Sequence, residues 1–304
     1  MMIAIDLGSN TLRVIEYDGK RWGKSFEKIV RTAQGLNDTG EIGLLAMERI
    51  VNALNEAKES IDFTNKVIIA ITTAAMRMAS NSLKCLQIIE EQTGVRFRII
   101  DGEEEAMLTL MAVQNRLALL NRLTSQWALV DVGGGSTEVI VVSSDRTESK
   151  SFSLGIVTTS EKGQTPDILV KELNVWRETI SHYLASFKFS DPLDTLVLTA
   201  GTPTTVIAYL MGMEYLTYDS EKVNGSVLTR EDCSRVLNEL LAMDECSRAR
   251  FVGVGREELI IVGIEILKMI FDAFSLTHAI VIDDGLREGV ALNYYLKNQI
   301  PSLT

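Results

Sequence analysis

The stretch LVDVGGGSTEVIVV, residues 129–142, places an aspartate, three glycines and a glutamate between two apolar runs. Glycine weakens a strand and adds no packing surface, so three in succession indicate a tight turn. Asp131 and Glu138 flank that turn, and carboxylate oxygens suit a hydrated Mg²⁺ ion. A turn of this kind presents backbone N–H groups to an anion. The residues that would cradle phosphate in this way are Gly133, Gly134, Gly135 and Ser136.

The N-terminus carries a second copy of this pattern. AIDLGSNTLRVIEYDG, which starts at residue 4, aligns Asp6 with Asp131 and Gly8 with Gly133. Each copy is an apolar strand that ends in Asp-x-Gly, followed by a small polar loop and a second strand. Because the two aspartates stand at equivalent points of a repeat, we interpret them as ligands of metal-bound water rather than as caps of nearby N–H groups. The residues of this copy that would cradle the phosphates are Ser9 and Asn10.

Three further acidic residues follow Gly102 in the stretch IIDGEEEAMLTL. A carboxylate beside other acids or apolar walls can orient and deprotonate a water molecule. Acidic residues are also common in the first turn of a helix, where they offset the helix dipole, and we favour this interpretation for Glu103 and Glu104. The residue types alone do not separate Glu105 from these two. Glu138 could be a solvent-facing strand residue, but its place at the end of the glycine turn favours a role at the phosphate or the metal.

Binding phosphate also requires positive charge, and guanidinium groups hold phosphate oxygens in pairs. A lone arginine is usually a surface residue, so the residue types alone give no priority to Arg77 or Arg256 over the other arginines. A small-residue turn with Gly201, Thr202 and Thr205 leads into a predicted helix. This turn could bind phosphate or could simply pack closely, and both interpretations stay open.

The hydrophobic periodicity predicts the elements that position these residues. After each Asp-x-Gly turn we expect two more strands, a helix, a strand, a helix, a strand and a helix, with additional helices in the second half. In the first half the strands are 12–17, 23–30, 67–71 and 97–100, and the helices are 44–61, 81–93 and 103–120. In the second half the strands are 138–142, 150–154, 195–199 and 279–282, and the helices are 168–187, 230–241, 256–274 and two that begin at 203 and 286.

Two duplicated α/β halves imply a cleft between them. Both Asp-x-Gly turns would lie at the carboxyl ends of their first strands, which is where open α/β sheets bind ligands. We place the first domain at residues 1–123 and the second at 124–304, with the option that the last helix, about 286–304, packs back on the first domain.

The composition describes a compact and acidic chain. Of its 304 residues 46% are hydrophobic, 4 are proline, and the formal net charge is −11. Such a charge argues against non-specific nucleic-acid binding, and it requires a phosphate site to bring its own cations or a metal. We interpret Cys85, Cys233 and Cys246 as buried thiols of a reducing cytosol. No signal peptide or membrane-spanning stretch is expected, so we predict a cytoplasmic protein without a membrane partner.

The two turns resemble the phosphate-binding turns of the actin, Hsp70 and sugar-kinase superfamily. Within it, DLGSNT and DVGGGSTE together resemble the exopolyphosphatase and guanosine pentaphosphate phosphatase family (Ppx/GppA) in its short, two-domain form. Further segments follow in the family's order, namely TTAAMRMA, IIDGEEEAMLTL, FSLGIVTTSE, LTAGTPTTV, GREELIIVGIEIL and IDDGLREGV. The resemblance covers nearly the whole chain. It implies an α/β fold of two duplicated ribonuclease-H-like (actin-like ATPase) domains with an active-site cleft between them.

The family's hydrolases release the terminal phosphate of inorganic polyphosphate or of guanosine pentaphosphate, a nucleotide of the stringent response, usually with Mg²⁺. The resemblance therefore implies a Mg²⁺-dependent phosphoanhydride hydrolase acting on polyphosphate, on guanosine pentaphosphate (pppGpp to ppGpp), or on both. It implies that Glu105 is the catalytic base and that Arg77 and Arg256 bind substrate. Glu138 would orient the same water or hold the metal. The expected Mg²⁺ ligands are Asp6, Asp131 and Glu138.

Three departures from the family pattern bear on substrate preference: Thr158 after LGIV, GREE around Arg256, and Asp284 before the last glycine. Two other functions stay open. One is a non-catalytic or weakly catalytic sensor of the alarmone nucleotide or of polyphosphate, and the other is a phosphotransferase from ATP to a sugar or acid. The sequence does not decide between polyphosphate and guanosine pentaphosphate, although a short acidic chain favours short polyphosphate or the nucleotide. A homodimer is the default expectation for the assembly.

Overall fold

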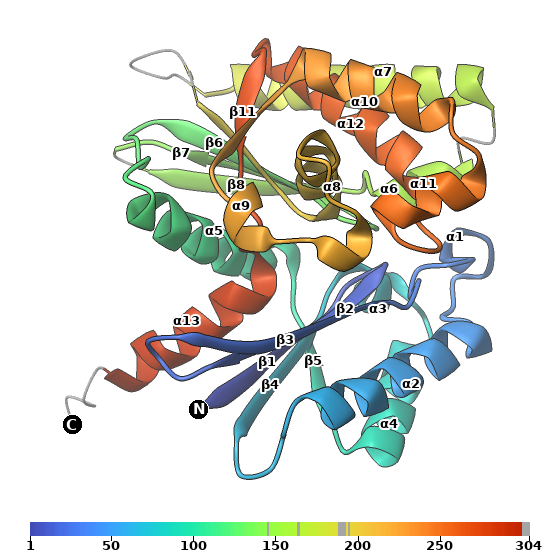
Figure 1. Cartoon of the computed structure of the whole chain (residues 1–304), viewed down its shortest axis with the longest axis vertical. Coiled ribbons are helices and arrows are strands. Elements are labelled where there is room, and N and C mark those ends of the chain that lie inside the picture. Colours follow the sequence, from blue (N-terminus) through green and yellow to red (C-terminus); the bar gives the residue numbers. More distant parts are fainter. Residues whose placement is uncertain (145, 163–164, 188–192, 194, 300–304) are drawn as a thin grey trace. The chain divides into compact units, whose positions relative to one another are not determined.

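Figure 1 shows the computed structural model of the chain, which describes residues 1–144, 146–162, 165–187, 193 and 195–299. The chain forms two compact units: unit 1 comprises Met1–Asn115 and Asp284–Thr304, and unit 2 comprises Arg116–Asp283. The boundary between the units thus lies between residues 115 and 116, and the predicted boundary lies between 123 and 124. The observed boundary has a physical reason, because Arg116 forms an ion pair with Glu221 of unit 2 over 2.9 Å and Arg122 donates to the carbonyl of Gly225.

Unit 1 is built on a five-stranded sheet in the order β3-β2-β1-β4-β5. Its strands are β1 (Met2–Leu7), β2 (Thr11–Tyr17), β3 (Trp22–Ile29), β4 (Val67–Thr72) and β5 (Phe97–Ile99). The first three strands pair antiparallel, whereas β4 and β5 run parallel to β1 after helical crossovers. The helices are α1 (Leu36–Thr39), α2 (Leu44–Ser60), α3 (Ala74–Met78), α4 (Ser82–Thr93), α5 (Gly102–Leu119), which begins in unit 1, and α13 (Leu286–Gln299).

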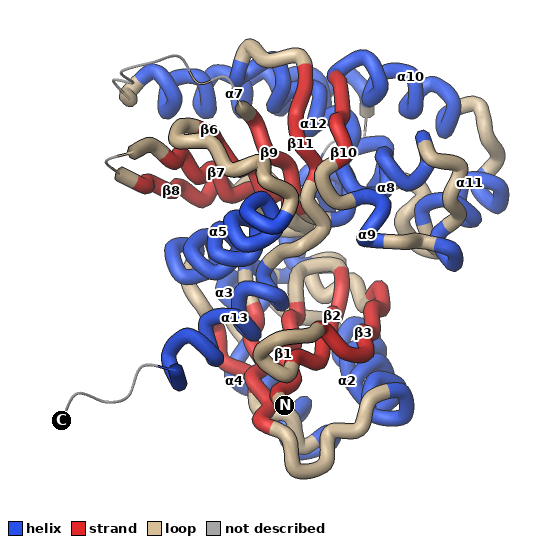
Figure 2. Tube along the Cα trace, turned by 60° about the vertical axis from the view of Figure 1, so that its left-hand side comes forward, coloured by secondary structure: helices blue, strands red, loops and turns tan. Residues whose placement is uncertain are grey.

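Helices cover both faces of this sheet, as Figures 1 and 2 show for α2 on one face and α13 on the other. Side chains alternate between the faces along a strand, so Met2, Ala4 and Asp6 of β1 share a face. Met2 and Ala4 pack there with Leu286 and Val290 of α13 in a buried apolar cluster. The core therefore holds β1 in place up to the carboxyl end at which Asp6 stands.

Unit 2 repeats this arrangement in a six-stranded sheet of order β10-β11-β9-β6-β7-β8. Its strands are β6 (Trp127–Val132), β7 (Thr137–Val142), β8 (Thr147–Phe152), β9 (Leu196–Thr199), β10 (Ser226–Thr229) and β11 (His278–Val281). Read across the sheet, β8-β7-β6-β9-β11 has the same order and the same strand directions as β3-β2-β1-β4-β5 in unit 1. The predicted duplication of a ribonuclease-H-like α/β half is therefore confirmed. The additional strand β10 pairs antiparallel with β11 at the edge.

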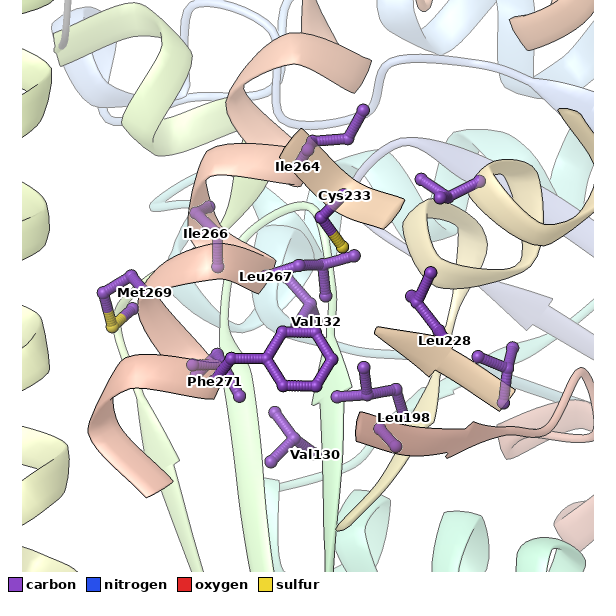
Figure 3. Close-up of a cluster of buried hydrophobic side chains, with 14 of the residues drawn as sticks. Val130, Val132, Leu198, Leu228, Cys233, Ile264, Ile266, Leu267, Met269 and Phe271 are labelled. Carbon is purple, nitrogen blue, oxygen red and sulfur yellow. The ribbon is translucent and has the colours of Figure 1, made fainter. Parts of the chain in front are cut away.

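The core of unit 2 lies between its sheet and its longest apolar helix. The helices are α6 (Ile156–Lys162), α7 (Pro166–Ala185), α8 (Gly201–Leu210), α9 (Ser220–Val223), α10 (Arg230–Leu241), α11 (Glu245–Val252) and α12 (Leu259–Phe274), with a 3₁₀ turn at Tyr215–Thr217. Figure 3 shows Phe271 of α12 beside Val130, Val132 and Leu198. Burial of one such side chain stabilises the fold by about 1.5–3 kcal/mol. Val130 and Val132 thereby anchor β6 on either side of Asp131, whose side chain projects to the other face.

Most predicted elements agree with the structure to within a few residues. The sequence patterns do not predict α1, α3, α6, α9, α11 or β10, because each has eight residues or fewer and is too short for its periodicity to stand out from the neighbouring loops. Helix α12 begins at Leu259 rather than at 256, and β8 ends at Phe152 rather than at 154. Cys246 is exposed, which corrects the expectation of three buried thiols. Among the described residues, no helix is both long and apolar enough to cross a membrane.

Candidate functional site

The glycine turn and its N-terminal counterpart adopt the same hairpin turn in the two units. In unit 1 the N–H of Gly8 donates to the carbonyl of Thr11 over 3.0 Å. In unit 2 the N–H of Gly133 donates to the carbonyl of Ser136 over 2.9 Å. Both turns connect the first and second strands of their sheets. The sequence repeat therefore corresponds to a repeat in backbone hydrogen bonding.

In each unit, the segment that follows the third strand donates backbone hydrogen bonds to carbonyl groups of the hairpin turn. In unit 2 the carbonyl of Gly134 accepts from the N–H of Val157 in α6 over 2.8 Å. In unit 1 the carbonyl of Asn10 accepts from the N–H of Arg31 over 2.9 Å. Within the described residues, the N–H groups of Gly134 and Gly135 have no hydrogen-bond acceptor. Because the carbonyls point into the neighbouring segment, these N–H groups are oriented as an anion site requires.

Gly155, directly before α6, packs against the glycine turn. A Cβ atom at this position would lie 2.4 Å from the carbonyl oxygen of Gly134 and 2.4 Å from Cα of Gly135. Both atoms belong to the backbone, so the turn can keep its shape only with glycine at position 155. Sequence reasoning misses this contact, because a single glycine in FSLGIV gives no sign of what it packs against.

Asp131 of β6 and Glu138 of β7 stand directly opposite each other in the strand ladder, so their side chains share one face of the sheet. Glu138 is 1% exposed, which excludes a solvent-facing strand residue. Its Oε1 accepts a hydrogen bond from Ser151 Oγ over 2.8 Å. Two adjacent carboxylates are a set of hard oxygen donors, which suits Mg²⁺ when water and phosphate complete its coordination shell.

In unit 1 the position equivalent to Glu138 is occupied by Arg13, which carries the opposite charge. Asp6 is 9% exposed and stands opposite Arg13 in the β1–β2 ladder. Arg13 Nε also donates to Glu27 over 3.1 Å. In the part of the chain that the structure describes, no three His, Cys, Asp or Glu side chains are grouped so that they could hold a metal. Of the three predicted ligands, Asp131 and Glu138 are neighbours in unit 2, and Asp6 belongs to unit 1.

Burial separates the three glutamates at the start of α5. Glu103 is exposed, and Glu104 accepts two hydrogen bonds of 2.6 Å from Arg98. These hydrogen bonds lower the pKa of the Glu104 carboxyl. Glu105 is buried, with 8% of its surface exposed. All three glutamates stand in the first turn of α5, and Glu105 differs from the other two by its burial.

Arg77 of α3 contacts the buried carboxylate of Glu105. Its Nη1 donates to Glu105 Oε2 over 3.2 Å and to the carbonyl of Ile100 over 2.8 Å. Helix α3 follows β4 and α5 follows β5, and these strands are parallel neighbours. The sheet therefore delivers both residues to its carboxyl edge, where α/β sheets bind ligands. A carboxylate held in one orientation by an arginine can position a water molecule for attack.

Arg256, in the loop before α12, is attached to the small-residue turn at the start of α8. Its Nη2 donates to the carbonyl of Gly201 over 3.0 Å and to Thr205 Oγ1 over 3.3 Å. Ala200, directly before this turn, has φ 79° and ψ −179°. That conformation is almost restricted to glycine, so the backbone is strained here. Arg256 and the turn therefore form one cluster within unit 2.

Two further residues, Gly263 and Arg248, pack closely around this cluster, and their types in the sequence give no sign of it. A Cβ atom at Gly263 of α12 would lie 2.4 Å from Thr202 Oγ1. The buried guanidinium of Arg248 in α11 donates to the carbonyl of Glu257 over 3.2 Å and so holds the loop that carries Arg256. In the sequence a buried arginine cannot be distinguished from one at the surface.

Known proteins are similar to this chain in sequence and in fold. The model of the Ppx/GppA phosphatase family matches residues 24–298. The bifunctional 3-dehydroquinate synthase/phosphatase of Fusobacterium nucleatum is 27% identical over 95% of this chain, which spans 46% of that protein. Exopolyphosphatase 2 of Mycobacterium tuberculosis is 26% identical over 95% of this chain and 97% of its own length. The crystal structure of the Aquifex aeolicus Ppx/GppA family member, 27% identical, has a TM-score of 0.74 and covers 99% of both chains.

Proposed function

Because the chain belongs to the Ppx/GppA phosphatase family, we propose that it is a phosphoanhydride hydrolase that releases the terminal phosphate of inorganic polyphosphate, of guanosine pentaphosphate, or of both. The observation that carries the proposal is the contact between Arg77 and the buried carboxylate of Glu105. Phosphoryl transfer needs a positioned water and neutralised charge, and little covalent help from the protein. A buried carboxylate with a fixed orientation is suited to hold that water.

The proposed reaction assigns a role to each predicted site residue. The N–H groups of the turns at residues 9–10 and 133–136 bind phosphate oxygens, and Arg77 and Arg256 balance their charge. Glu105 orients the attacking water and accepts its proton. A bond forms between the water oxygen and the terminal phosphorus, and the bond from that phosphorus to the bridging oxygen breaks. The shortened phosphate chain leaves with the electron pair on the former bridging oxygen.

Mg²⁺ is part of the proposal. Asp131 and Glu138 would hold the ion, because they are adjacent carboxylates on one face of the sheet, and Asp6 is the third proposed ligand. When bound, Mg²⁺ adds positive charge at the phosphate oxygens. The net charge of −11 increases the need for such a cation at an anionic substrate.

We further propose that the protein prefers short polyphosphate or guanosine pentaphosphate to long polyphosphate as its substrate. A long polyanion needs an extended basic surface, whereas this chain has 41 acidic and 30 basic residues. The name of the similar protein from Mycobacterium tuberculosis, exopolyphosphatase 2, supports a polyphosphate substrate.

The deciding experiment measures phosphate release with Mg²⁺ from short polyphosphate, long polyphosphate, guanosine pentaphosphate and ATP. The native protein and Glu105→Gln are compared on each substrate, together with a native sample from which Mg²⁺ has been removed by a chelator. We expect release from one or more of the first three, lost in Glu105→Gln and without Mg²⁺, while Glu105→Gln still binds the substrate. No release from any of them, with tight binding in both proteins, would identify a binding protein instead. Conversion of ATP to ADP only when a sugar or acid acceptor is added, with the phosphate recovered on that acceptor and not as free phosphate, would identify a phosphotransferase.

A further inference from the structure

Residues 30–34 form a wall beside the turn of residues 9–10 in unit 1, which is proposed to bind phosphate. The N–H of Arg31 donates to the carbonyl of Asn10 over 2.9 Å, and the N–H of Ala33 donates to the carbonyl of Ser9 over 2.8 Å. These bonds fix Arg31 directly beside the turn. This arginine belongs to none of the sequence motifs described above.

Arg31 has an unfavourable backbone conformation for its residue type. Its φ is 48°, in the left-handed region that favours glycine. A side chain there costs free energy relative to glycine, because Cβ approaches the following carbonyl oxygen. Strain of this kind is concentrated at functional sites, where the side chain is needed despite its cost.

A second arginine holds this segment in place. Arg49 of α2 donates through Nε to the carbonyl of Val30 over 2.8 Å, and through Nη2 to Oε1 of Gln34 over 2.9 Å and the carbonyl of Arg31 over 3.4 Å. All of these acceptors are neutral oxygens. Burial lowers the pKa of Arg49, and the positive charge of Arg31 lowers it further. Two neighbouring guanidinium groups repel each other, and a bound anion would offset that repulsion.

Two buried polar atoms at this wall also lack partners. Among the described residues, neither Asn10 Oδ1 nor Thr32 Oγ1 has a hydrogen-bond partner, and Thr32 is 0% exposed. Buried polar atoms are normally satisfied by protein, ordered water or ligand. The protein alone therefore does not complete the hydrogen bonding of this wall.

We propose that Arg31, held in place by Arg49, is a phosphate-binding subsite of unit 1 beside the turn of residues 9–10. Its ligand is a phosphate group of the substrate next to the terminal one. The inference rests on the proposed function, because that function supplies a ligand with consecutive phosphates. Tripolyphosphate and the 5′-triphosphate of guanosine pentaphosphate share this chemistry, so both are tested.

Binding of each ligand is measured by titration calorimetry with Mg²⁺ on the Glu105→Gln background, which prevents turnover. Arg31→Gln and Arg31→Gly are compared with Arg21→Gln, which removes the same charge from an exposed residue of unit 1. We expect both Arg31 variants to weaken binding about tenfold, the effect of one charge-assisted hydrogen bond, and Arg21→Gln to leave it unchanged. Loss with one ligand only would identify which of the two uses the subsite.

The glycine variant separates binding from folding. Arg31→Gly removes the strained Cβ, so its midpoint of urea unfolding should be equal to or higher than that of the native protein. Arg49→Lys keeps the charge but loses the forked contacts, so it should weaken binding several-fold and speed hydrogen exchange in residues 30–36. If Arg31→Gly lowers the midpoint and leaves affinity unchanged, Arg31 is only structural and the subsite is refuted.

The subsite and the proposed hydrolysis can fail independently. Phosphate release by the native protein, with Arg31 variants that bind like Arg21→Gln, would refute the subsite and keep the function. Binding that depends on Arg31 without any phosphate release would keep the subsite and refute the function. If the native protein neither binds nor hydrolyses these ligands, both are refuted.

Discussion

Arg77 donates a hydrogen bond to Glu105 across 3.2 Å, and these two residues lie on helices that follow neighbouring parallel strands of unit 1. The second bond of Arg77, to the carbonyl of Ile100, fixes the guanidinium at the start of α5. The buried carboxylate is thereby prevented from turning freely. This arrangement distinguishes Glu105 from the two glutamates before it in the same helix.

The first prediction concerns the roles of these glutamates. Glu105→Gln should lower turnover on the order of 100-fold or more, because a general base typically contributes at least that factor, while KM stays within about threefold. Glu104→Gln is the matched control. It removes the ion pair with Arg98, whose side chain is 58% exposed, so the free energy of unfolding should fall by no more than about 1 kcal/mol and turnover should stay native. Equal turnover losses in the two variants would contradict the assignment of Glu105.

A second prediction follows from the packing of Gly155 on the glycine turn. Gly155→Ala should displace the backbone of residues 134–135, because the added Cβ would lie 2.4 Å from it. We expect KM for tripolyphosphate to rise about tenfold or more, with a loss of about 1–3 kcal/mol in unfolding free energy from overpacking. Gly43→Ala is the control, because a Cβ atom added at that position would meet no neighbouring heavy atom within 4 Å. A native KM in Gly155→Ala would show that the turn does not depend on this contact.

Arg248 provides a third prediction, about the loop that carries Arg256. Arg248→Gln removes the buried guanidinium that donates to the carbonyls of Leu240 and Glu257, so the free energy of unfolding should fall by about 3 kcal/mol in urea titrations. KM should rise as well, because the loop loses its support. Arg250→Gln in the same helix removes an ion pair of an arginine that is 64% exposed, and it should cost less than about 1 kcal/mol. Similar losses of stability in the two variants would contradict a supporting role for Arg248.

The fourth prediction concerns the pH dependence of stability. Burial raises the pKa of Glu16, but hydrogen bonds from Lys66 and from the N–H of Lys24 outweigh it, so the pKa is lowered in the folded state. A carboxyl with a lowered folded pKa stabilises the fold above its unfolded pKa and loses this contribution as pH falls through the folded pKa. Glu16→Gln should therefore be less stable than the native protein near pH 7, and the difference should shrink below about pH 4.5, the ordinary value. Urea unfolding at several pH values measures this difference in the free energy of unfolding. A difference that grows on acidification would contradict the stabilising role of the ion pair between Glu16 and Lys66.

Local patterns in the sequence already determine much of this protein. The two Asp-x-Gly turns, the apolar strands around them and the helical periods are properties of neighbouring residues, so the duplicated fold and its two turns follow from the chain itself. The acidic stretch after Gly102 is equally visible. Because the same turn occurs twice, the repeat also indicates that Asp6 and Asp131 occupy equivalent positions. The strand registers agree, since each aspartate is the next-to-last residue of the first strand of its unit.

Only the tertiary structure decides which of several similar residues is buried and what it contacts. Glu103, Glu104 and Glu105 are identical in type, and Glu105 is distinguished by burial and by an arginine 28 residues earlier in the chain. The contact of Gly155 with the glycine turn and the support of Arg31 by Arg49 are likewise made between separate elements. A short sequence window contains none of these partners. Their distances are set by how strands and helices pack, and packing is a property of the whole unit.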